Sequence, residues 1–289
     1  MNILIGIITY KRHNVLVECV KRTKAMLDKH DCNASYVFVA NDMDSTLGEK
    51  LEFVERKHII IPDKNTGVAG GRNLIIRYAN ECGLYDHILF IDDDAYLETV
   101  PNFEQLCKSS IYACTSFDAN GYCRAEDLPP GFKLGCLGIS KIVPVGTFIG
   151  VAHIMGKEIV QKFSYDEITS YGFEEFNLSF RARSFGHEIY VISNFKVIHL
   201  KDPNGRIDKK KVAENRLKSK IYLALTFYTP IIGYVNITFN IMLAFYRGIS
   251  LTQIFKLIAE AKRNVTSIPM KRRVLLMKRL RQLNFPILR

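Results

Sequence analysis

The chain has 289 residues, of which 48% are hydrophobic and 24% are charged, and it contains no repeats or low-complexity tracts. These values are ordinary for a globular protein that buries a proper core, and they exclude a repeat or low-complexity chain. The net charge of +11 is uneven, because residues 205–289 hold 18 Lys and Arg against three acidic residues, a net +15, which leaves −4 for residues 1–204. This asymmetry predicts that the tail meets an acidic partner and that the front part does different work.

The seven cysteines and the N-terminus indicate the compartment. The cysteines are odd in number and form no CxxC pair, which fits neither a zinc site nor a disulfide framework. Reduced thiols in the cytosol are the simpler interpretation. The first ten residues lack the basic leader and cleavage site of a secretory signal. We therefore interpret them as a buried first strand of a cytoplasmic protein.

Short apolar runs alternate with helical patterns over the first third of the chain. The predicted strands are residues 2–8, 35–40, 58–61 and 87–91, and the predicted helices are residues 15–30 and 70–82. This alternation predicts a parallel α/β sheet covered by helices on both faces. Ligands bind beyond the carboxyl ends of the strands in such sheets, which selects residues 9–12, 41–44 and 92–94.

The pattern loosens after residue 118. Glycines and prolines predict a loop over residues 118–150 that ends in a strand at 147–155. Two helices at 157–163 and 173–185 and two short strands at 189–192 and 197–200 are predicted to follow. A turn at 202–205 then leads into basic helices. We therefore predict a catalytic domain over residues 1–205 and a basic helical region over residues 206–289.

Three aspartates, Asp92, Asp93 and Asp94, directly follow the predicted strand at 87–91. Adjacent like charges raise one another's pKa unless a cation relieves them. Carboxylate oxygens suit Mg²⁺ or Mn²⁺, which also bridge phosphate oxygens. In an extended chain the outer pair, Asp92 and Asp94, projects to the same side. The triplet predicts a metal that neutralises charge on a departing diphosphate; the alternative is a solvated turn or a helix N-cap.

A glycine-rich segment, NTGVAGGRN at residues 65–73, precedes and opens the predicted helix at 70–82. Glycines let the backbone approach a ligand closely, and a helix N-terminus favours anions. Arg72 adds a guanidinium that can pair with phosphate. The spacing is neither GxGxxG nor GxxxxGKS, which disfavours a Rossmann dinucleotide site and a P-loop. The alternative is a tight turn whose glycines serve helix packing.

Taken together, NTGVAGGRN and the later ILFIDDDAYL resemble the family 2 glycosyltransferases of the GT-A fold. That family shows N-x-G-x-A-G-G-x-N and then a hydrophobic strand that ends in DxD. Residues 7–12 look like its opening strand and turn, and residues 41–45 resemble its nucleotide-binding stretch, with either Asp42 or Asp44 in the nucleotide role. The resemblance covers residues 1 to about 200 and implies a GT-A-type, mostly parallel sheet covered by helices.

A third segment, GFEEFNL at residues 172–178 followed by Arg181, resembles the family's E-D-x-D-L-x-x-R helix. In relatives the second acidic residue is the base that deprotonates the acceptor hydroxyl. Position assigns this role to Glu175, with Glu174 as the alternative. Here Glu stands for Asp, and Asn177 stands for the second Asp. Without the resemblance, the two acids would read as helix capping at an N-terminus.

The resemblance implies an inverting transfer of a sugar from a nucleotide sugar, with UDP favoured and dTDP second, as in bacterial rhamnosyl-, galactosyl- and N-acetylglucosaminyl-type transferases. It implies Mn²⁺ or Mg²⁺ held by Asp92, Asp94 and His199. The implied donor-binding residues are Thr9, Arg12, Asp42, Asp44, Asn65, Gly71, Arg72, Asn73, Asp92 and Asp93. The implied acceptor is a glycan or lipid-linked glycan of surface polysaccharide synthesis, such as lipopolysaccharide or capsule.

The tail combines apolar and basic segments. Residues 221–246 carry no charge and are long enough to cross a bilayer, but Pro230 and several polar residues favour an apolar hairpin or an interfacial helix pair. Basic helical patterns at 251–261 and 274–283 favour an anionic membrane surface as partner. The tail is similar to that of family members at the inner face of the plasma membrane, so we expect a peripheral location there. The alternative is a helical subdomain packed on the core.

Three other functions fit parts of the sequence. The basic tail suggests a nucleic-acid-binding protein, but no nucleic-acid motif is present, and we expect no nucleic-acid partner. A sugar nucleotidyltransferase shares the sheet type and the metal, but it would carry a glycine-rich basic loop after the first strand, where this chain has residues 9–12. A non-catalytic nucleotide-sugar binder fits if Glu175 does not act as a base.

Overall fold

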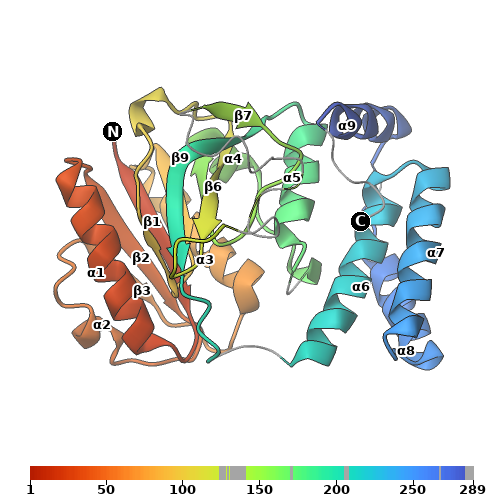
Figure 1. Cartoon of the computed structure of the whole chain (residues 1–289), viewed down its shortest axis with the longest axis horizontal. Helices are drawn as coiled ribbons and strands as arrows, with labels where there is room; N and C mark the ends of the chain where they lie inside the picture. Colours follow the sequence, from red (N-terminus) through yellow and green to blue (C-terminus); the bar gives the residue numbers. More distant parts are fainter. Residues whose placement is uncertain are drawn as a thin grey trace.

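The computed structural model describes residues 1–123, 128, 130, 141–169, 172–204, 208–266 and 268–283. It contains one large sheet with helices on both faces and a group of helices beyond one end of the sheet (Figure 1). Within the predicted loop at 118–150, residues 124–127, 129 and 131–140 lie outside the described residues. None of the six cysteines in the described part of the chain forms a disulfide.

The first half of the sheet is parallel. Its strands are β1 (Ile3–Thr9), β2 (Ala34–Ala40), β3 (Lys57–Ile60) and β4 (His87–Ile91), in the order β3-β2-β1-β4. The connecting helices are α1 (His13–Lys29), α2 (Leu47–Lys50) and α3 (Gly67–Cys82). These strands lie within one residue of the predicted ones. Helix α3 begins three residues before the predicted start, so most of the glycine segment is helical.

The second half of the sheet is mixed. It contains β5 (Ala95–Leu97), β6 (Ile111–Phe117), β7 (Ile142–Pro144), β8 (Ala152–Gly156) and β9 (Ile189–His199). Strand β8 runs antiparallel to β4 and β6, whereas β6 and β9 are parallel. The described part of the chain thus forms a nine-stranded α/β sheet, which confirms the predicted fold class.

The second half of the sheet differs from the sequence prediction. Strands β5, β6 and β7 were not predicted, and β7 lies inside the predicted loop at 118–150. Strand β9 is one strand of 11 residues where two short ones were expected. The register between β6 and β9 shifts between Ala113 and Thr115. This irregularity accommodates the polar residues 193–194 inside a continuous strand, and it explains why the apolar pattern suggested a break.

Alternation along β1 builds the core on both faces of the sheet. Ile3, Ile5 and Ile7 pack under α1, whereas Leu4 faces the α3 side. Because successive side chains point to opposite faces, a strand buried on both sides is apolar throughout, as the run at residues 3–8 is. This packing fixes the carboxyl ends of β1, β2 and β4 at one edge.

Two helices lead from the sheet toward the tail. Helix α4 (Lys157–Lys162) follows β8, and α5 (Glu174–Ser184) follows a short 3₁₀ turn at Glu167–Thr169. The tail contains α6 (Lys209–Phe227), α7 (Pro230–Tyr246), α8 (Leu251–Arg263) and α9 (Met270–Gln282). Figure 1 shows α5 between the sheet and α6, with α7 farther from the sheet. The tail helices share a hydrophobic core with Phe180 of α5.

The uncharged segment at 221–246 forms the end of α6 and all of α7, which pack against each other. The break falls at Thr229, directly before a proline at the first position of α7. This arrangement agrees with the expected apolar hairpin. Among the described helices, none has both the length and the hydropathy that a membrane crossing requires.

Helix α7 is oriented opposite to an ordinary surface helix. Its buried residues are Gly233, Asn236, Asn240 and Ala244. Its exposed large apolar side chains are Ile231, Tyr234, Val235, Phe239, Met242, Phe245 and Tyr246, each at least half exposed. Helices of globular proteins turn their apolar side toward the core. We call the exposed set the α7 apolar face.

Candidate active site

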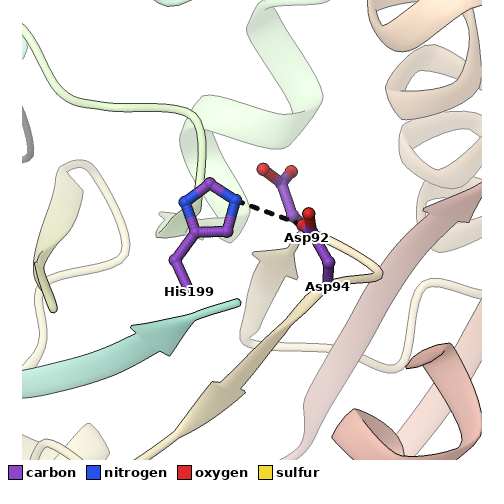
Figure 2. Close-up of side chains that lie close together, drawn as sticks. All are labelled: Asp92, Asp94 and His199. Atoms are coloured by element: carbon purple, nitrogen blue, oxygen red, sulfur yellow. Dashed lines mark ion pairs between the residues drawn. The ribbon is translucent and has the colours of Figure 1, made fainter. Parts of the chain in front are cut away.

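The acidic triplet lies where β4 ends. The backbone N–H of Asp92 donates a hydrogen bond to the carbonyl of Val151, 2.8 Å away, which ties this turn to the start of β8. Ligand atoms of Asp92, Asp94 and His199 lie within 4.8 Å of one another. Figure 2 shows the imidazole of His199 facing the two carboxylates. The structure thus brings together the three residues predicted to hold a metal.

Asp94 is the anchored member of this trio. Its carboxylate lies 3.2 Å from Nε2 of His199 and 2.6 Å from a guanidinium nitrogen of Arg12. The backbone N–H of Asp202 donates to the same carboxylate at 2.9 Å. Burial alone would raise the pKa of Asp94, but the hydrogen bond and charge of His199 and the charge of Arg12 outweigh it and lower the pKa. Asp94 is therefore charged and fixed in position.

Asp92 is the member that faces the open side. Its side chain is 39% exposed and has only a distant ion pair, at 3.8 Å, with Arg72. Desolvation by the surrounding protein raises the pKa of Asp92, and the charges of Asp94 and Asp93 add to this effect, although Arg72 and His199 oppose it. Its negative charge is thus poorly compensated by the protein. A bound cation would compensate it.

The middle aspartate points elsewhere. Asp93 is 4% exposed, lies 3.1 Å from the guanidinium of Arg12, and accepts a hydrogen bond from the backbone N–H of Tyr10 at 3.4 Å. Burial raises its pKa to about 6, although Arg12 opposes this shift. Asp93 and Arg12 therefore join the ends of β4 and β1. The structure places Arg12 on the acidic triplet and gives Thr9 a buried position at the end of β1.

The two aspartates after β2 are bridged by one histidine. His13 lies 3.0 Å from Asp42 through Nε2 and 2.9 Å from Asp44 through Nδ1. Asp44 is further held by Lys50 at 2.7 Å and by Thr46, and these contacts lower its pKa far below the usual value. The second carboxylate oxygen of Asp42 has no hydrogen-bond partner in the described structure. Of the two aspartates, Asp42 is therefore the one that can still accept a hydrogen bond from a ligand.

The glycine segment is attached to the end of β2 by a residue outside the predicted set. The buried Asn41 accepts hydrogen bonds from the N–H and hydroxyl of Thr66 and donates one to the carbonyl of Gly67. Asn65 is exposed and accepts from the N–H of Gly67 at 2.8 Å. These contacts hold the start of α3 beside the end of β2, where a ligand would lie.

Two members of the predicted donor set have mainly packing contacts. A Cβ on Gly71 would lie 3.0 Å from the side chain of Ile8, so this glycine lets α3 approach β1 closely. Asn73 donates to the carbonyl of Tyr165 and to Glu167, and it accepts from the N–H of Tyr165 at 2.7 Å. Asn73 thus fixes the segment before α5. The sequence pattern alone did not distinguish these two packing residues from residues that contact a ligand.

Arg72 is buried and joins the acidic triplet to α5. Its guanidinium lies 2.8 Å from Oε1 of Glu175 and donates to the carbonyl of Gly150 at 2.9 Å. It also stacks over the ring of Tyr165, 5.1 Å from the centroid. Burial alone would lower the pKa of Arg72, but Tyr165 and the carboxyl groups of Glu175, Glu174 and Asp92 outweigh it and raise the pKa. The predicted phosphate partner is therefore largely engaged by protein groups.

The two glutamates at the start of α5 differ in environment. Glu175 has the direct ion pair with Arg72, whereas Glu174 lies 4.0 Å from it. Oε2 of Glu174 is buried without a hydrogen-bond partner in the described structure. Burial, followed by the charge of Glu175, raises the pKa of Glu174 to about 8. At neutral pH Glu174 is thus protonated, whereas Glu175 is the member of the pair that has the direct ion pair with Arg72.

The backbone around the glutamates is shaped for this arrangement. Phe173 has a φ of 77°, a left-handed conformation that turns the chain into α5 directly before Glu174. Gly150 lies so close to Oε1 of Glu175 that a Cβ there would overlap the carboxylate. Neither feature was anticipated from the sequence, although the phenylalanine follows Gly172, whose φ is also positive.

The trio of Asp92, Asp94 and His199 fits a divalent cation. It offers two hard carboxylates and one imidazole, a donor set that suits Mn²⁺ and Mg²⁺. The incompletely compensated charge of Asp92 points the same way. Nδ1 of His199 is buried and has no hydrogen-bond partner among the described residues. A third ligand from His199 distinguishes this site from a solvated acidic turn.

No family model matches the chain. Among characterised proteins, a segment of 98 residues is 34% identical to the dTDP-rhamnosyl transferase RfbF of Shigella flexneri, and it covers 32% of this chain and 30% of that protein. The chain thus matches less than a third of that relative's length.

Solved structures match over almost the whole chain. GalNAc-T7 with UDP, GalNAc and Mn²⁺ aligns with a TM-score of 0.63 at 12% identity, over 99% of this chain and 58% of that one. TarS 1–349 of S. aureus with UDP-GlcNAc gives 0.58 at 13% identity, over 100% and 89%. The mannosyltransferase PcManGT of Pyrobaculum calidifontis with GDP-Man and Mn²⁺ gives 0.56 at 12% identity, over 97% and 79%. The chain therefore has the GT-A fold of glycosyltransferases, as its motifs predicted.

Proposed function

We propose that the protein is an inverting, metal-dependent glycosyltransferase. One observation carries the proposal: the guanidinium of Arg72 lies 3.8 Å from Asp92 and 2.8 Å from Glu175. The candidate metal site and the candidate base therefore lie on either side of one buried side chain. Inverting transfer needs this arrangement, because the acceptor must attack the sugar from the face opposite the leaving diphosphate.

The residues divide into three roles. Asp92, Asp94 and His199 hold Mn²⁺ or Mg²⁺, which neutralises charge on the departing diphosphate when bound. Glu175 accepts the proton of the acceptor hydroxyl. Arg72 positions Glu175 through their ion pair, while Glu174 stays protonated beside it.

The nucleoside is proposed to bind beyond β1 and β2, beside the start of α3. Asp42 is the better candidate to bind the nucleobase, because both carboxylate oxygens of Asp44 already accept hydrogen bonds from Thr46 and Lys50. The donor class is a pyrimidine nucleotide sugar. UDP is supported by the ligands of GalNAc-T7 and TarS, and dTDP by the name of the Shigella relative.

The acceptor is proposed to be a glycan or lipid-linked glycan of bacterial surface polysaccharide synthesis. The α7 apolar face supports a peripheral position on the inner face of the plasma membrane, because monomeric soluble proteins rarely expose a continuous apolar surface of this kind. Lys256 and Lys262 of the neighbouring α8 would add attraction to anionic lipids. An apolar face favours lipid over nucleic acid as the partner of the tail.

The test is a thermal-shift and turnover screen of the purified protein with UDP-, dTDP- and GDP-sugars, each with Mn²⁺ and with EDTA. We expect one pyrimidine nucleotide sugar to raise Tm only with metal, and to be consumed when acceptor is added. Absence of any metal-dependent shift in a folded sample would overturn the proposal and leave a binding or scaffold role.

A further inference from the structure

A cavity of about 800 Å³ lies between the start of α5 and the first two tail helices. Cavities of roughly 300–1,000 Å³ are typical of small-ligand sites. Its apolar wall includes Phe176, Leu217, Leu243 and Ile249. This cavity belongs to neither the metal trio nor the nucleoside region, and the proposed chemistry does not use it.

Three cations line the same cavity. They are Arg216 and Lys220 of α6 and Arg247 at the end of α7, and no acidic residue is among the lining residues that the structure describes. The side chains of Arg216 and Arg247 form no ion pair or hydrogen bond with the described residues. Lys220 is oriented by the buried Asn240, to which it donates at 2.8 Å. The cavity therefore combines an apolar wall with uncompensated positive charge.

The cavity also lies next to both the start of α5, which carries Glu175, and the end of the α7 apolar face. Gly172 and Phe173, which line it, directly precede Glu174 and Glu175. The lining residue Arg247 directly follows Tyr246, the last residue of the α7 apolar face. A ligand in this cavity would thus extend from the apolar surface toward the catalytic glutamate.

We propose that this cavity binds the phosphate group and the adjoining apolar chain of a lipid-linked acceptor. The inference rests on the proposed glycosyltransferase function, for which it names the acceptor class. Arg216, Lys220 and Arg247 hold the phosphate through charge-assisted hydrogen bonds, and the apolar wall holds the first part of the chain. The sugar beyond the phosphate then lies at the start of α5, where Glu175 can accept its hydroxyl proton.

The binding test uses three small probes without vesicles: decyl phosphate below its micelle concentration, decanol and inorganic phosphate. Calorimetry on the full chain measures each affinity. Because the chain has no tryptophan, Phe176→Trp places a single fluorescent reporter on the cavity wall for a second, independent measurement. The charge variant is Arg216→Gln with Arg247→Gln, and the matched control is Lys271→Gln with Lys278→Gln on the exposed side of α9.

We expect decyl phosphate to bind at least about tenfold more tightly than either decanol or inorganic phosphate, since both parts of the probe contribute. The charge variant should lose at least about tenfold in that affinity, and the α9 control should not. Three results would overturn the proposal. They are equal affinities of the wild type for decanol and decyl phosphate, equal affinities of the two double variants for decyl phosphate, and no binding of decyl phosphate by the wild type.

The same preparations are titrated with the pyrimidine nucleotide sugars and Mn²⁺. Probe binding without donor binding would retain the cavity as an amphiphile site and reject the glycosyltransferase function. Donor binding without probe binding would retain the enzyme and reject this acceptor site.

Discussion

Nη1 of Arg72 lies 2.8 Å from Oε1 of Glu175, and the two residues are 103 positions apart in the chain. The pair is buried, and it connects the first turns of α3 with the first turn of α5. Since the same guanidinium approaches Asp92, it determines how far the candidate base lies from the candidate metal. We therefore expect both the stability of the fold and the proposed catalysis to depend on this side chain.

Replacing Arg72 should destabilise the fold. Arg72→Met leaves Glu175 and Glu174 buried without a cation, and breaking a buried pair in this way costs about 3–5 kcal/mol in the free energy of unfolding. Urea unfolding at neutral pH measures the loss. The double variant Arg72→Met with Glu175→Gln removes both charges and should be more stable than the single variant by at least about 1 kcal/mol. Strictly additive losses would argue against a coupled pair.

Turnover should depend on Glu175 and much less on Glu174. Glu175→Gln keeps the volume but removes the proton acceptor, so kcat should fall by about 10²–10⁴-fold while donor affinity is retained. Glu174→Gln is the matched control, because this carboxyl is already protonated at neutral pH. Steady-state kinetics and donor titration separate the two effects. If the Glu174 variant is the inactive one, the roles of the two glutamates are reversed.

Metal affinity should depend on Asp92. Asp92→Asn removes the open ligand of the trio, and we expect Mn²⁺ affinity to fall by at least about tenfold, the lower end of what even supporting residues of metal sites contribute. Asp93→Asn changes the neighbouring carboxylate, which faces Arg12 outside the trio, and should leave Mn²⁺ affinity unchanged. Calorimetric titration of the free protein with Mn²⁺ compares them. Equal losses in both variants would contradict the assignment.

The raised pKa of Glu174 predicts a pH-dependent stability difference. Its folded pKa of about 8 exceeds the unfolded value of 4.5, so between these values the folded state binds more protons and its stability falls as pH rises. Glu174→Gln lacks this proton, so the variant should gain relative to the wild type by on the order of 1 kcal/mol between pH 7 and 9. Urea unfolding of both proteins across that pH range measures the difference in the free energy of unfolding. A difference that does not change with pH would contradict the prediction and indicate that Glu174 is ionised throughout.

The α7 apolar face predicts vesicle binding. Phe239→Ser with Met242→Ser should reduce co-sedimentation with anionic vesicles by at least about tenfold, because each side chain fully buried in lipid contributes about 1.5–3 kcal/mol. Leu84→Ser is the matched control, since Leu84 is 66% exposed but lies in the turn before β4. Equal binding of both variants would exclude α7 as the docking helix.

The sequence predicted those parts of the fold whose pattern is local. Strands β1 to β4 are apolar runs bounded by polar residues, and they were located to within one residue. Strand β6 was not predicted because its second half mixes apolar residues with Thr115 and Ser116, which are polar although they are fully buried. The prediction of two short strands in place of β9 was wrong for a related reason, because the polar residue Ser193 is buried inside the strand.

The candidate site was predictable where its residues are neighbours in sequence or where the family resemblance assigned them. Asp92 and Asp94 flank one position, and the resemblance placed His199 with them. The contact between Arg72 and Glu175 depends on the antiparallel insertion of β8 beside β4, which no local pattern reveals. The positions of Asn41 and Tyr165 depend on the same long-range packing.

Gly150 offers a criterion for comparing this chain with others. Any side chain at that position would displace the carboxylate of Glu175, so the identity of one residue on the loop before β8 limits where this carboxylate can lie. An alanine there would force this carboxylate to shift away from its present contact with Arg72. In a chain with the same strand order, a glycine at this position is compatible with the present geometry and a larger residue is not.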